Sequence, residues 1–125
     1  QDFIFACTTY PSDPAFMKRV EAEAEYNIKR LRNHASLAMW CGNNEIYEGM
    51  RYWGWDKKYT DPGIMEGMKQ GYDKLFRELL PRKVAELDPD RSICMVLRTR
   101  PIGDVPKAGR LPTAIIGVSG MVRTV

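Results

Sequence analysis

The chain has 125 residues, a net charge of +3 and 44% hydrophobic residues, which fits one small globular domain. It holds no apolar stretch as long as a membrane span, and its three cysteines show neither metal-ligand spacing nor an even count. These features argue against a membrane partner, a disulfide framework and a cysteine-ligated metal.

The net positive charge of the chain comes from its last 34 residues. Residues 92–125 carry five basic residues against one acid, Asp104, and contain none of the thirteen aromatic residues. A basic region can indicate binding to nucleic acid or to an anionic membrane. Because these basic residues are neither clustered nor interleaved with aromatic rings, we expect neither partner.

The first predicted helix begins at Pro14, and the chain before it opens at Gln1-Asp2 in a strand or its exit loop. Ser12 or Asp13 can cap its free amides, and proline suits its first turn. Its apolar stripe consists of Met17, Val20, Ala24, Ile28 and Leu31. The opposite side is charged and is expected to be a solvated face, with Glu25 and Lys29 spaced as an ion pair.

An apolar strand is predicted at residues 37–41, followed by a polar tip at 42–45. An apolar run without alternation is typical of a strand in a parallel sheet that helices cover. Chemistry in such sheets collects at the carboxyl ends of strands, where Glu45 falls. The single histidine, His34, is expected at the opposite end of this strand and is interpreted as structural.

Residues 46–63 are predicted to form a long loop that is rich in aromatic residues. Aromatic rings stack on sugars while amides and carboxylates bind their hydroxyls, so the loop favours a carbohydrate site. Its rings are Tyr47, Tyr52, Trp53, Trp55 and Tyr59. Packing of the loop on its own domain is the alternative, and we assign it to Tyr59 and Tyr52.

A second helix is predicted to begin at Pro62, with a kink or break at Pro81 because proline lacks an amide donor. Its apolar stripe consists of Met65, Met68, Tyr72, Leu75, Phe76 and Leu79. No glycine-rich phosphate loop or cluster of metal ligands accompanies these elements. We therefore expect no metal and no organic cofactor.

Three motifs together resemble one known family. The segment from Leu31 through Trp40-Cys-Gly-Asn-Asn-Glu45 resembles the acid/base strand of glycoside hydrolase family 2 β-mannosidases, as do the opening residues 1–13 and Trp53-Gly-Trp55. The resemblance covers about residues 1–92. It implies an α/β fragment of a (β/α)8 TIM barrel with about two βα units.

The resemblance also implies roles for individual residues. Glu45 matches the catalytic acid/base and Asn44 the residue that binds the sugar near its 2-hydroxyl, while Trp53 matches an active-site tryptophan. Asp2 is expected on the same rim as Glu45, lining the sugar site. Glu48 is interpreted as structural, because this family takes its nucleophile from a later strand, outside this chain.

Residues 93–125 do not fit the resemblance and are predicted to be an irregular or disordered tail. The bases that encode Pro101-Ile-Gly-Asp-Val-Pro-Lys107 can, read one position earlier, encode Ala-Asn-Trp-Gly-Arg-Pro-Lys, a string similar to β-mannosidases. We hypothesise a single-base deletion near Ser92 that shifted the reading frame.

The resemblance implies retaining hydrolysis of terminal β-D-mannosyl residues by the parent enzyme, and an inactive fragment here. Its partners would be a β-mannoside or oligosaccharide substrate and the rest of its own barrel. Two alternatives stay open. One is another family 2 glycosidase of the β-galactosidase or β-glucuronidase type, and the other is a non-catalytic carbohydrate-binding or interaction module.

Overall fold

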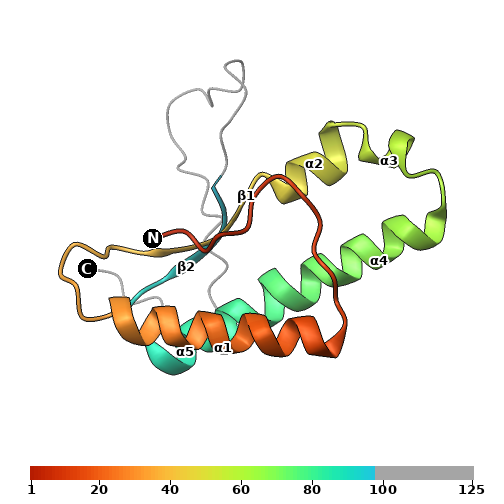
Figure 1. Cartoon of the computed structure of the whole chain (residues 1–125). Coiled ribbons are helices and arrows are strands. Elements are labelled where there is room, and N and C mark those ends of the chain that lie inside the picture. The colour runs from red at the N-terminus through yellow and green to blue at the C-terminus, as the bar shows by residue number, and fades with distance from the viewer. Residues whose placement is uncertain (98–125) are drawn as a thin grey trace, which may run out of the picture.

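The computed structural model describes residues 1–97, which form helices packed against one face of a small parallel sheet (Figure 1). In chain order the elements are α1 (Pro14–Leu31), β1 (Trp40–Asn44), α2 (Ile46–Tyr52), α3 (Trp55–Lys58), α4 (Pro62–Tyr72), the π-helix η1 (Asp73–Leu79), α5 (Leu80–Leu87) and β2 (Ile93–Leu97). The predicted mixture of helices and parallel strands is confirmed.

The sheet is a parallel pair, β1 and β2, with the N-terminal segment (residues 1–7) along the other edge of β1. Two isolated bridges join that segment to β1, Asp2 to Cys41 and Ala6 to Asn44. Between these two bridges the N-terminal segment advances by four residues, from Asp2 to Ala6, whereas β1 advances by only three, from Cys41 to Asn44. The extra residue interrupts the ladder as a β-bulge does, so the strand or exit loop expected at Gln1-Asp2 is part of a broken strand that continues to Cys7.

The strand predicted at residues 37–41 lies instead at Trp40–Asn44. Ladder hydrogen bonds begin there, with the amide of Cys41 donating to the carbonyl of Gln1 at 2.8 Å. The amide of Leu37 donates to His34 in a turn at 3.1 Å. The start of β1 is therefore set by where hydrogen-bonding partners are available, and not by where the apolar run begins.

Residues 93–97 were expected to belong to the irregular tail, and they form strand β2 instead. The reason is pairing: this apolar run lies along the second edge of β1, and the amide of Trp40 donates to the carbonyl of Ser92 at 3.0 Å. The rest of the predicted irregular region, residues 98–125, lies outside the described residues, as does most of the sequence on which the frame-shift hypothesis rests.

Helix α1 forms as its sequence predicts. Asp13 caps it by accepting a hydrogen bond from the amide of Phe16 at 2.9 Å, and Val20, Ala24 and Ile28 are buried. Its charged side is not wholly solvated, which corrects the expectation. Two of its acidic residues, Glu21 and Glu25, contact Lys83 of α5 at 3.1 and 3.7 Å.

The second predicted helix runs without a break through α4, η1 and α5 (Figure 1). Of the kink or break expected at Pro81, the break does not occur, and the expected continuation to Leu87 is confirmed. The π-helical winding of η1 ends with the amide of Leu80 donating to the carbonyl of Leu75, five residues back. A proline in a regular α-helix clashes with the carbonyl four residues before it. The wider π-helical turn directly before Pro81 changes which carbonyl faces the proline ring, so the helix continues.

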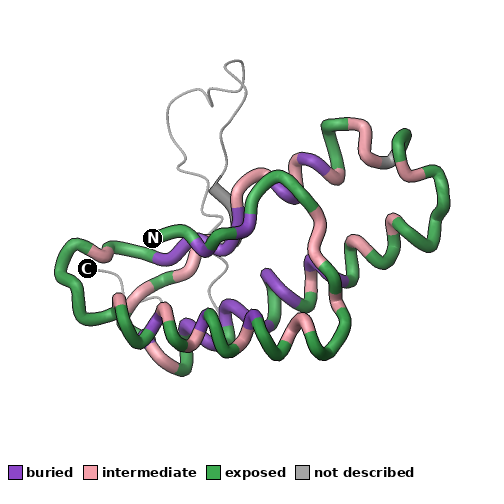
Figure 2. The backbone as a smooth tube through the Cα atoms, in the orientation of Figure 1, coloured by how far each residue is buried: buried purple, intermediate pink, exposed green. Residues whose placement is uncertain are grey.

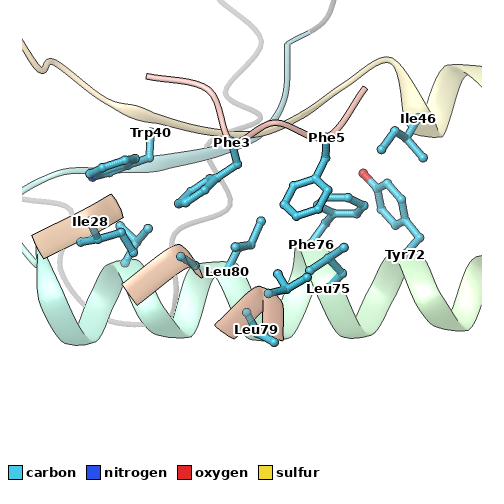
Figure 3. Close-up of a cluster of buried hydrophobic side chains, with 13 residues drawn as sticks. Phe3, Phe5, Ile28, Trp40, Ile46, Tyr72, Leu75, Phe76, Leu79 and Leu80 are labelled. Atoms are coloured by element: carbon cyan, nitrogen blue, oxygen red, sulfur yellow. The ribbon is translucent and has the colours of Figure 1, made fainter. Parts of the chain in front are cut away.

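The core lies between the sheet and the helices (Figures 2 and 3). Phe3, Phe5 and Trp40 point from the extended segments toward the helices, with the rings of Phe3 and Trp40 5.3 Å apart and those of Phe5 and Phe76 5.4 Å apart. Ile4, between the two buried phenylalanines, is 78% exposed. Within the described residues, helices therefore cover only one face of the N-terminal segment.

Candidate active site

Two strained residues meet at the carboxyl end of β1. Glu45, which follows the strand directly, has a φ of 57°, and Cys7, at the end of the N-terminal segment, has a φ of 48°. A non-glycine residue in the left-handed region costs about 1–2 kcal/mol. Such strain clusters at functional sites, because the surrounding structure has to hold it in place.

Asn44 connects these two residues. Its Nδ2 lies 3.5 Å from Oε2 of Glu45 and 3.7 Å from Sγ of Cys7, and that sulfur lies 3.9 Å from the same carboxylate oxygen. The backbone amide of Cys7 also donates to the carbonyl of Asn44 at 3.0 Å. A carboxyl group, an amide and a thiol therefore converge at one point on the sheet edge.

Asn43 supports the site from inside the molecule. It is 1% exposed, and its Oδ1 accepts a hydrogen bond from the amide of Ile46 at 3.3 Å. The hydroxyl of Tyr72 also hydrogen-bonds with Asn43, and burial raises the pKa of Tyr72. This asparagine was expected in a polar tip, but it belongs to β1 and ties the start of α2 to the core.

Asp2 lies apart from Glu45, which corrects its expected place on the same rim. It bridges to Cys41, three residues before Asn44 along β1, or about 10 Å at the usual rise per residue. Burial of the thiol, with Cys94 and Asp2 beside it, raises the pKa of Cys41 to about 12. Cys7 therefore occupies the position beside Glu45 that was expected for Asp2.

The predicted aromatic loop is largely helical, because it folds into α2 and α3. Trp55 packs beneath Gly49, where an added Cβ would lie 2.7 Å from the indole ring. Trp53 is 47% exposed and stands edge-on to Trp55 at 6.1 Å. Trp53 thus contacts Trp55 and still exposes about half of its surface to solvent.

The two tyrosines assigned to packing differ from each other. Tyr59 is partly buried, with the ammonium of Lys58 lying 5.4 Å from its ring centre. Tyr52 is 63% exposed, so the packing role assigned to it is wrong.

Comparison with known proteins places this site in context. No model of a known protein family matches the chain. β-Mannosidase B of Emericella nidulans and that of Aspergillus niger are each 37% identical to it over 91 residues, which cover 71% of this chain. The crystal structure of the β-D-mannosidase from Dictyoglomus thermophilum matches 77% of the chain at 38% identity, with a TM-score of 0.60.

The chain is homologous to one segment of the β-mannosidases. It spans 11% of the length of each of these curated relatives and 11% of the matched structure. The resemblance to β-mannosidases that the sequence motifs indicated is thereby confirmed.

The remaining candidate residues are Glu48 and His34. Glu48 is in the first turn of α2 and is partly buried. His34 is exposed in the turn after α1, before β1 begins, and its carbonyl accepts a hydrogen bond from Arg91 at 3.4 Å. Among the described residues, no cluster of histidine, cysteine or carboxylate side chains could hold a metal ion, and no helix is long and apolar enough to cross a membrane.

Sequence reasoning missed Cys7 as a member of the site. The cysteine spacing assigned it no role, yet it is exposed and its sulfur faces Glu45. The two residues are 38 positions apart in the chain, and only the pairing of the N-terminal segment with β1 brings them together. No local pattern signals that contact.

Proposed function

We propose that this chain is the acid/base portion of a β-mannosidase-type retaining glycoside hydrolase of family 2, whose catalytic domain is a (β/α)8 barrel. The relatives carry the name β-mannosidase, and the parallel pairing of β1 with β2 and the helices on one face of the sheet suit about two βα units of such a barrel. The rest of the barrel is the partner that would cover the open face.

Glu45 is the proposed acid/base. The carboxyl ends of strands are where this architecture places chemistry, and Glu45 follows β1 directly in a strained conformation that aims it at Asn44 and Cys7. This placement is the observation that carries the proposal. Glu45 protonates the leaving oxygen, and then deprotonates the water that attacks the glycosyl-enzyme.

The neighbouring residues bind the sugar in this proposal. The Nδ2 group of Asn44 bonds a sugar hydroxyl near the anomeric centre, and the exposed indole of Trp53 offers a ring face to the sugar. A contact of Asp2 with substrate is retained from the resemblance, although Asp2 pairs with Cys41 in this structure. The nucleophile is a carboxylate from a later strand, held about 5–5.5 Å from the acid/base in retaining enzymes.

A segment exchange tests the proposal. Residues 1–92 replace the matching segment in the Dictyoglomus thermophilum enzyme, which is 38% identical to this chain. We expect the chimera to hydrolyse an aryl β-mannoside, and Glu45→Gln to lower kcat about 10²-fold or more for a poor leaving group. The loss should be smaller for an activated leaving group, which needs no protonation, and azide should restore turnover by attacking the glycosyl-enzyme without a base.

Glu48→Gln in the same chimera is the matched control, because it removes the same charge three residues along α2. Glu48→Gln should leave unchanged the way in which kcat depends on the leaving group. A chimera with a preference for aryl β-galactoside or β-glucuronide would support the alternative family 2 activities. An active chimera in which Glu45→Gln costs nothing would refute the assignment of the acid/base.

A further inference from the structure

A hollow lies between α2 and the α4–η1 helix. It contains none of the residues assigned to sugar hydrolysis. Its volume is about 390 Å³. The residues that line it are Tyr47, Met50, Arg51, Lys69, Tyr72, Asp73 and Arg77. This volume lies within the usual range of small-molecule pockets, about 300–1,000 Å³.

The hollow carries an excess of positive charge. Three cations from three different elements line it, Arg51 of α2, Lys69 of α4 and Arg77 of η1, against the single carboxylate of Asp73. Asp73 is paired with Arg77 at 3.0 Å. Two further positive charges thus face the same space, an arrangement that an anion would stabilise.

The walls of the hollow are aromatic and held in place. The rings of Tyr47 and Tyr72 lie 6.1 Å apart at 50° to each other. Arg51 donates to the hydroxyl of Tyr47 at 2.9 Å, and the guanidinium of Arg77 lies 5.9 Å from the ring centre of Tyr72. Tyr72 is 5% exposed and is part of the hydrophobic core, so this wall is rigid.

We propose that this hollow binds a small organic anion, a carboxylate or phosphate group carried on a single ring. The ring would pack on the two tyrosines, and the charged group would lie among Arg51, Lys69 and Arg77. Guanidinium groups bind carboxylate and phosphate oxygens in pairs, whereas an ammonium acts as a point charge. A neutral ring of the same size would keep the packing and lose the charge contacts.

The full 125-residue chain is titrated with benzoate and with phenyl phosphate, and with benzamide as the neutral ring of equal size. Binding is followed through the backbone amide NMR shifts of residues 47–51 and 69–77. Both anions should move these signals, and benzamide should bind at least about threefold more weakly, the effect of one or two exposed charge contacts. A stronger response to one anion identifies the group that the site prefers.

Arg51→Gln and Lys69→Gln test the charge contacts, and each should weaken anion binding about threefold to fivefold. Lys74→Gln is the control: Lys74 is exposed on η1, carries the same charge, and does not line the hollow. Equal affinity for benzoate and benzamide, no binding of either anion, or an equal loss in Lys74→Gln would overturn the proposal. None of these measurements depends on hydrolysis, so they test this proposal independently of the proposed function.

Discussion

At the scale of single residues, the site depends on a backbone conformation that its own side chains do not favour. Glu45 and Cys7 both have positive φ values, and the side chains that gather around them make contacts of 3.5–3.9 Å, which are long for hydrogen bonds. These contacts hold the carboxyl group in position and add little to the stability of the fold. Stability and the proposed chemistry are therefore opposed at Glu45.

Glu45→Gly should increase the stability of the chain by about 1 kcal/mol, because glycine adopts a positive φ without steric cost. The measurement is urea denaturation of the 125-residue chain. Glu48→Gly is the matched control: this residue lies within α2, so glycine should lower stability by about 1 kcal/mol. Equal destabilisation by both substitutions would show that no strain resides at Glu45.

At the scale of elements, a buried polar cluster joins the loop after α5 to the start of the sheet. Asp88 is 5% exposed; it accepts a hydrogen bond from the indole nitrogen of Trp40 at 2.8 Å and pairs with Arg91 at 2.9 Å. Arg91 in turn donates to the carbonyl of Leu37 at 2.6 Å. The cluster sets where the chain leaves α5 and where both strands begin.

Asp88→Ala should destabilise the chain by about 1–3 kcal/mol, the usual cost of leaving a buried hydrogen-bonding group without its partner. It leaves the fully buried indole of Trp40 without its acceptor and Arg91 without its counter-charge. Asp90→Ala, at an exposed position two residues later, should change stability by less than about 0.5 kcal/mol. Urea denaturation compares the two variants, and similar small effects would mean that the cluster is dispensable.

The contact of α1 with α5 includes a group of charges that depends on pH. Hydrogen bonds from Lys83 and Arg82 lower the pKa of Glu21 below 4.5, those from Lys29 and Lys83 lower that of Glu25, and Glu21 and Glu86 raise the pKa of Lys83 above 10.5. The glutamates contribute stability above pH 4.5 and lose it as the pH falls through their lower folded values. Lys83 contributes fully below pH 10.5 and loses its contribution as the pH rises beyond it.

Lys83→Met should therefore reduce the loss of stability between about pH 5 and about pH 3, because each glutamate loses one of the two cations that lower its pKa. Urea denaturation at several pH values gives the slope. Lys74→Met removes an exposed lysine of η1 and should leave that slope unchanged. If both variants follow the wild-type curve, the ion cluster adds no measurable stability.

At the scale of the whole molecule, the N-terminal segment has one side that the helices cover and one side that is exposed. Helices bury Phe3 and Phe5, while Ile4 between them is 78% exposed. The chain spans 11% of the length of its β-mannosidase relatives, and on the proposed function the rest of a larger enzyme would cover this exposed side. On the proposed function, the second carboxylate of the reaction comes from elsewhere in that enzyme.

The 125-residue chain alone should therefore not hydrolyse an aryl β-mannoside, since one carboxylate cannot complete a retaining reaction. The measurement is release of the aryl alcohol over a long incubation, with the chimera described above as the active control. Turnover that Glu45→Gln abolishes in the isolated chain would contradict this prediction. Measurable affinity for mannose without hydrolysis would instead favour the carbohydrate-binding module.

The sequence alone determined the features that a few neighbouring residues encode. The apolar stripe and the Asp13 cap of α1 follow from spacing and local hydrogen bonding, and both are confirmed. The place of Glu45 directly after a buried strand is also local, although the strand boundary was three residues too early. The resemblance to β-mannosidases rests on the same short motifs.

Only the tertiary structure decided which distant residues meet. The bulge between the N-terminal segment and β1 places Cys7, and not Asp2, beside Glu45. Ile93–Leu97 forms a strand because it pairs with the edge of β1, and the charges of the hollow come from two parts of the chain, α2 and the continuous α4–η1 helix. The physical reason is that strand register and helix packing depend on partners far along the chain, which no local periodicity records.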